Sequence, residues 1–76
     1  MMTALEYQEY VAELRKLTGE TENEVRQWIS NMAASMALEF PFWEVKRFIA
    51  IVGRYPTKSE VNLIRGVNLD LFYRFL

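Results

Sequence analysis

Apolar and polar positions recur with a helical period along most of the chain. Between Ala4 and Thr18 an apolar stripe faces a charged one, and the apolar positions are Tyr7, Tyr10, Val11, Leu14 and Leu17. The segment Glu22–Glu39 repeats the pattern and leads to Phe40, with Val25, Trp28, Ile29, Met32 and Met36 on one face. Spacings of three and four place such residues on one side of an α-helix. Two amphipathic helices joined by a short turn predict an antiparallel hairpin.

The second half of the chain is more apolar. The segment Pro41–Val52 is apolar on nearly every side, which predicts a buried or covered helix. Lys58–Arg65 and Leu69–Leu76 predict two shorter helices, and period-two alternation is too short for a strand. The prediction is one all-α domain over residues 1–76. It is a compact bundle of four or five short helices, in which a helical hairpin precedes a helix-turn-helix-like half.

Helix boundaries are marked by local motifs. Three Thr-x-x-Glu pairs predict capping boxes, in which each side chain accepts a backbone N–H of the other residue: Thr3 with Glu6, Thr21 with Glu24, and Thr57 with Glu60. Gly19 and Gly53 follow the first and third predicted helices, where a left-handed residue commonly ends a helix. Pro41 can occupy a first helical position.

Composition narrows the chemistry. The 76 residues include no Cys and no His, which removes disulfides, thiolate nucleophiles and the commonest general base and metal ligand. We therefore expect no enzyme, no cofactor or metal site and no evident small-molecule substrate. No signal peptide and no membrane-spanning run is apparent, so a cytoplasmic protein without membrane association is expected. The net charge of −1 is unevenly spread: residues 1–39 are acidic, and residues 40–76 are basic and rich in aromatic side chains.

The stretch Thr57–Leu76 resembles the helix-turn-helix of TetR-type repressors. The matching positions are Thr57, Val61, Gly66, Val67, Asn68, Phe72, Tyr73 and Phe75. The resemblance implies a compact, dimeric DNA-binding regulator in which phosphates are contacted by Lys58, Arg65, Asn68 and Arg74. The second helix nevertheless begins Leu69-Asp70-Leu71, where a DNA groove favours basic and amide side chains.

Apolar residues exceed what the short C-terminal helices can bury. A contiguous exposed apolar patch is typical of an interface. The segment Phe40–Trp43 reads either as an exposed aromatic hot spot or as a buried corner between helices. The leading prediction is a small helical interaction protein, either an adaptor, an inhibitor or an assembly factor of the kind common in phages and mobile elements. It would dock on a larger protein or on itself, with DNA binding as the alternative. The predicted apolar anchors are Phe42, Trp43, Leu63, Leu69, Leu71 and Phe75. The predicted polar rim is Lys46, Arg47, Arg54 and Lys58.

Overall fold

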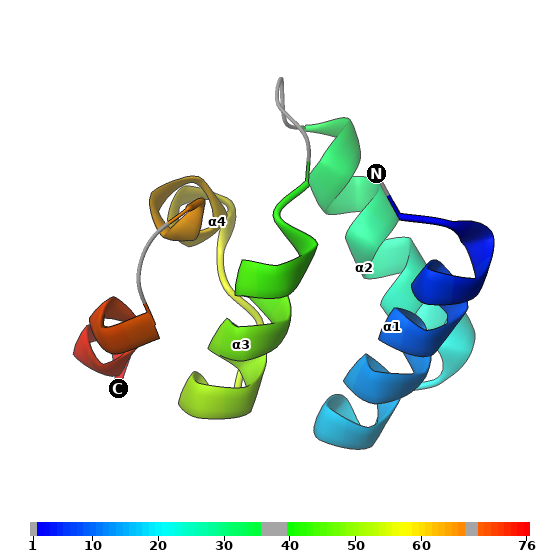
Figure 1. Cartoon of the computed structure of the whole chain (residues 1–76), viewed down its shortest axis with the longest axis horizontal. Helices are drawn as coiled ribbons and strands as arrows, with labels where there is room; N and C mark the ends of the chain where they lie inside the picture. Colours follow the sequence, from blue (N-terminus) through cyan, green and yellow to red (C-terminus); the bar gives the residue numbers. More distant parts are fainter. Residues whose placement is uncertain (1, 36–39, 67–68) are drawn as a thin grey trace.

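Four α-helices and a short 3₁₀-helix make up the fold. The computed structural model describes residues 2–35, 40–66 and 69–76. The elements are α1 (Ala4–Thr18), α2 (Glu22–Ala34), α3 (Phe42–Val52), α4 (Lys58–Ile64) and the 3₁₀-helix η1 (Leu69–Phe75). In Figure 1, α3 lies between the hairpin of α1 and α2 on one side and α4 with η1 on the other. The described residues form no strand, and the all-α prediction is confirmed.

The capping motifs are formed as predicted. In each of the three Thr-x-x-Glu pairs, the Thr hydroxyl and the Glu carboxylate each accept a backbone N–H of the other residue. Gly19 and Gly53 end α1 and α3 with φ of 75° and 84°, a left-handed conformation that glycine adopts without a steric penalty. Their N–H groups donate to the carbonyls of Arg15 and Ile49. Local sequence therefore determines where these helices begin and end.

Some element boundaries differ from the prediction. Helix α2 ends at Ala34, where the Ser35 hydroxyl donates to the Met32 carbonyl at 2.9 Å; residues 36–39 lie outside the described part. Side-chain donation of this kind competes with continuation of the helix. Pro41 is the residue before α3 rather than its first residue.

The last element is a 3₁₀-helix rather than the predicted α-helix. A 3₁₀-helix has three residues per turn, so side chains three apart share one line. This period directs both Phe72 and Phe75 toward Phe48 of α3, with ring centroids 6.0 and 5.3 Å apart. Both rings therefore pack η1 onto α3.

The core is built around α3. Its buried residues Val45, Phe48 and Ile49 lie among buried side chains from every other helix. The hairpin contributes Tyr10, Val11, Leu14, Val25 and Ile29, and the C-terminal elements contribute Val61, Ile64 and Phe72. An apolar helix near the centre of the fold is what the sequence predicted for Pro41–Val52.

The aromatic residues near the start of α3 pack as a corner. Trp28 stacks on Tyr55 at 4.4 Å and meets Phe40 edge-on at 6.0 Å. Phe40 is buried and Phe42 is half-buried, whereas Trp43 is exposed. The face of α2 that carries Trp28 is therefore a core face, and the segment Phe40–Trp43 is a buried corner with one outward tryptophan.

Tyr10 carries a core hydroxyl that makes no hydrogen bond with any other described residue. Its side chain is buried, and this burial raises the pKa of the phenol. Its ring meets Phe42 edge-on at 5.2 Å, a contact that phenylalanine would keep. Since an unsatisfied buried polar group is destabilising, Tyr10→Phe is expected to raise the free energy of unfolding by about 1 kcal/mol in urea titrations. Tyr73→Phe, at an exposed ring, is the control and should leave stability unchanged; a loss of stability in Tyr10→Phe would contradict the assignment.

Candidate protein-binding surface

One side of α3 faces outward. Trp43, Lys46, Arg47 and Ala50 recur at spacings of three and four, opposite the buried face of the same helix. Trp43 is 56% exposed, although tryptophan is usually well buried. The indole lies in the first turn of α3 and is available for contact with another molecule.

Two cations hold the indole of Trp43 in place. The ring centroid lies 5.0 Å from Nζ of Lys46 and 4.5 Å from Cζ of Arg47. Cations at such distances are attracted to the face of an indole. These contacts restrain the Trp43 side chain, and a restrained side chain loses less entropy on binding.

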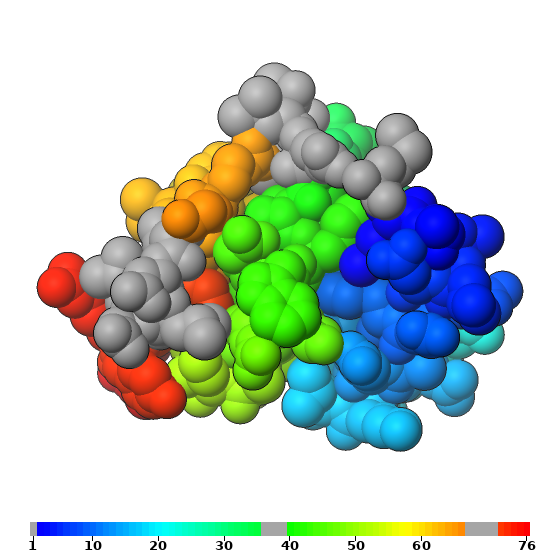
Figure 2. Space-filling model, in the orientation of Figure 1, coloured from blue at the N-terminus to red at the C-terminus, as the bar shows by residue number. Residues whose placement is uncertain are grey.

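Helix α1 forms the other wall of a groove beside Trp43. Lys46 Nζ and Glu13 Oε2 form an ion pair at 2.6 Å that joins α3 to α1. One hollow of about 290 Å³ is lined by Met2, Glu6, Glu9, Tyr10, Glu13, Trp43 and Lys46. A second hollow of about 300 Å³ is lined by Glu13, Lys16, Leu17, Lys46, Arg47 and Ala50. Glu13 and Lys46, which form the ion pair, line both hollows, so the two hollows adjoin along α1 and α3. Figure 2 shows α1, in blue, adjoining α3, in green.

The two ends of this groove differ in charge. The end beside Trp43 carries Glu6 and Glu9, and the other end carries Lys16 and Arg47. We call this surface, from Met2 to Ala50 through both hollows, the α1–α3 groove. Comparison with protein families, curated proteins and solved structures gave no match.

The structure brings together part of the predicted docking set. Trp43, a predicted anchor, lies against Lys46 and Arg47, two predicted rim residues. Phe42 and Phe75 differ from the prediction because both pack against the core, on Tyr10 and Phe48 respectively. Both rings are half-buried, so each exposes only part of its surface.

The remaining predicted anchors lie apart from the groove lining. Leu63 is 65% exposed on α4, as its position on the outer face of that helix predicted. Leu69 and Leu71 lie outside the residues whose side chains the structure describes. Lys58 is exposed at the first position of α4. Their part in docking remains a prediction.

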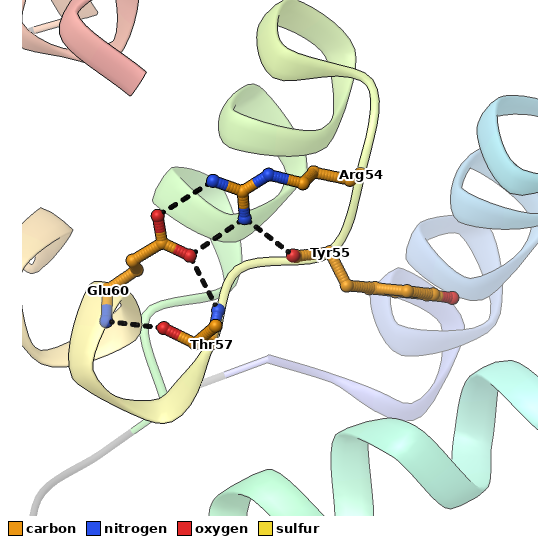
Figure 3. Close-up of polar contacts among 4 residues, drawn as sticks. All are labelled: Arg54, Tyr55, Thr57 and Glu60. Carbon is orange, nitrogen blue, oxygen red and sulfur yellow. Dashed lines mark hydrogen bonds and ion pairs between the residues drawn. The ribbon is translucent and has the colours of Figure 1, made fainter. Parts of the chain in front are cut away.

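Arg54, another predicted rim residue, braces α4 instead. Its guanidinium binds both carboxylate oxygens of Glu60, at 2.8 and 2.9 Å, and donates to the Tyr55 carbonyl at 3.2 Å (Figure 3). Glu60 also accepts the Thr57 N–H at 2.9 Å. The Arg54 guanidinium, and then the Thr57 N–H, lower the pKa of Glu60 to about 2. The charge of Arg54 is therefore engaged within the fold.

The residues predicted to contact phosphate are dispersed. Lys58 and Arg74 are exposed, and Asn68 lies outside the described residues. Arg65 is half-buried, and its buried Nε and Nη2 atoms have no hydrogen-bond partner in the part of the chain that the structure describes. Gly66 adopts the positive φ of 69° that a helix-turn-helix turn requires, but η1 directs Phe72 into the core. DNA contact by these residues remains a prediction.

Sequence reasoning missed the contribution of α1. Glu6, Glu9, Glu13 and Lys16 read as a solvated charged stripe, and Leu17 reads as part of the buried one. Leu17 is in fact 47% exposed and lines the groove. Leu17 lies at the edge of the apolar stripe of α1, beside the acidic residues. This position was the feature of the sequence that could have indicated its exposure.

The described residues show no sign of two other classes of site. No helix among them is long and apolar enough to cross a membrane. Within the same residues, no group of three or more acidic side chains is placed to hold a metal ion.

Proposed function

We propose that this chain is a small protein-binding module without catalytic activity, which docks the α1–α3 groove on a larger protein or on a second copy of itself. The observation that carries the proposal is Trp43, an exposed indole restrained by Lys46 and Arg47. Binding energy at protein interfaces concentrates in tryptophan, tyrosine and arginine residues near the centre of the contact. Trp43 and Arg47 are residues of two of these types.

The surroundings of Trp43 support the same function. The groove offers apolar lining from Leu17 and Ala50 next to charged residues of both signs. Charges around an apolar centre steer partners and select among them more than they add affinity. An adaptor, an inhibitor or an assembly factor, for example of phage or mobile-element type, would act in this way without chemistry of its own.

Trp43→Ala is expected to weaken partner binding at least tenfold, because truncating a central tryptophan anchor typically costs about 2 kcal/mol or more. The partner is isolated by affinity capture with the full chain and identified by mass spectrometry, and its dissociation constant is then measured for each variant. Tyr73→Ala is the matched control, since Tyr73 is 60% exposed but lies on η1.

Three results separate the functions. Loss of binding in Trp43→Ala with full binding in Tyr73→Ala supports the proposal. Equal binding by wild type and Trp43→Ala contradicts it. Affinity for random duplex DNA that falls steeply with salt would support the helix-turn-helix alternative instead, because phosphate contacts release counterions.

A further inference from the structure

The two ends of the α1–α3 groove are opposite in charge, so each end is complementary to the other. Helices α1 and α3 run in the same direction, since Tyr10 meets Phe42 near one end and Glu13 meets Lys46 further along. Glu9 lies at the acidic end and Lys16 at the basic end. The two residues are seven apart, which is two helical turns, so they share one face of α1 about 10 Å from each other. Both side chains are exposed, and neither forms an ion pair with another described residue.

We propose that a second copy of this chain occupies the α1–α3 groove, which rests on the protein-binding function proposed above. The two copies are related by a two-fold axis that lies in the plane of the interface and is perpendicular to α1 and α3. This axis places α1 of one copy antiparallel on α1 of the other copy. Glu9 of each copy then faces Lys16 of the other, and the contact is made twice because a two-fold interface is isologous.

The same rotation also provides a binding site for Trp43 on the other copy. It places Trp43, at the acidic end, over the other copy's basic end, where Leu17 and Ala50 line the second hollow. The indole of each copy is then buried against apolar side chains. An occupant with one sign of charge would meet like charges at one end of the groove, whereas a second copy in this orientation meets opposite charges at both ends.

The size of the surface predicts a weak dimer. Helix α1 has 15 residues and is about 22 Å long. A contact face two helices wide and of this length buries roughly 1,000 to 1,200 Å² of accessible surface, summed over both copies. This area is at the low end for specific protein interfaces. We therefore expect dissociation constants in the micromolar range and dimers that weaken with added salt.

A charge exchange on α1 tests the arrangement. Glu9→Lys alone and Lys16→Glu alone each place like charges opposite one another, so each homodimer should weaken at least tenfold relative to wild type. An equimolar mixture of the two variants restores both opposite-charge pairs. Its dissociation constant should return to within about threefold of the wild-type value. Sedimentation equilibrium over a wide concentration range at low salt gives all four constants.

Matched controls change charge by the same amount elsewhere. Glu22→Lys on α2 and Lys58→Glu on α4 alter exposed residues outside the groove lining and should leave dimerisation unchanged. A wild-type chain that stays monomeric at low salt, variants that dimerise like wild type, or a mixture as weak as its components would each overturn the dimer. If the chain is monomeric but Trp43→Ala still loses a captured partner, the dimer fails and the proposed function stands. If capture is also insensitive to Trp43→Ala, both fail.

Discussion

Phe48→Ala is expected to lower the free energy of unfolding by about 3 to 5 kcal/mol. Phe48 is fully buried at the centre of α3, and its ring packs on Phe72 and Phe75 of η1. Removal of the ring leaves a cavity between α3 and η1. Domains of this size have about 4 to 11 kcal/mol of stability, so the variant should be near its unfolding limit.

Urea unfolding followed by circular dichroism measures this effect. Trp43→Ala is the matched control, because it truncates an aromatic ring on the exposed side of the same helix. It should lose less than about 1 kcal/mol, mainly from the two cation–ring contacts. A Phe48→Ala chain as stable as the control would contradict the packing of η1 on α3.

Glu60→Ala is expected to lower the free energy of unfolding by about 1 to 2 kcal/mol, since it removes a helix cap and a surface ion pair together. The carboxylate joins the start of α4 to the loop after α3 through Thr57 and Arg54. Glu24→Ala is the matched control, because Glu24 closes the equivalent capping box of α2 and, among the described residues, forms hydrogen bonds with Thr21 alone. Its loss should be smaller; equal losses would show that Arg54 contributes nothing.

The contribution of Glu60 also depends on pH. Its pKa of about 2 in the folded chain lies below the ordinary value of 4.5. The folded state therefore binds this proton less readily than the unfolded state, and the stabilisation is complete above pH 4.5 and lost as the pH falls toward 2. Water and salt screen this surface pair, so the loss is smaller than the pKa difference alone implies. Unfolding of Glu60→Gln should vary less with pH than unfolding of wild type across this interval.

Local patterns predicted the helices and most of their ends. The Thr-x-x-Glu pairs and the glycines at 19 and 53 act through neighbouring backbone groups, so sequence alone reveals them. The 3₁₀ form of η1 was not predictable in this way, because it depends on Phe72 and Phe75 reaching Phe48 from a distant part of the chain.

The candidate site was predictable only in part. Trp43, Lys46 and Arg47 were identified because the helix that carries them has more apolar positions than one face can bury. The half-burial of Phe75 was not predicted, since it comes from tertiary packing on Phe48. The role of α1 was missed because an acidic stripe looks like an ordinary solvated face until Lys46 reaches Glu13 across the groove.

The most direct test is to observe the indole N–H groups of Trp28 and Trp43 by nuclear magnetic resonance in isotope-labelled protein. A binding partner, or unlabelled protein as the second copy, is titrated into the sample. Trp43 is exposed beside the α1–α3 groove, whereas Trp28 is half-buried against Tyr55 and Phe40 and serves as an internal control. We expect the Trp43 indole and the backbone amides of Glu9, Lys16 and Ala50 to shift while the Trp28 indole stays in place. Shifts confined to Leu63, Tyr73 and Leu76, with an unchanged Trp43 indole, would contradict binding through the groove.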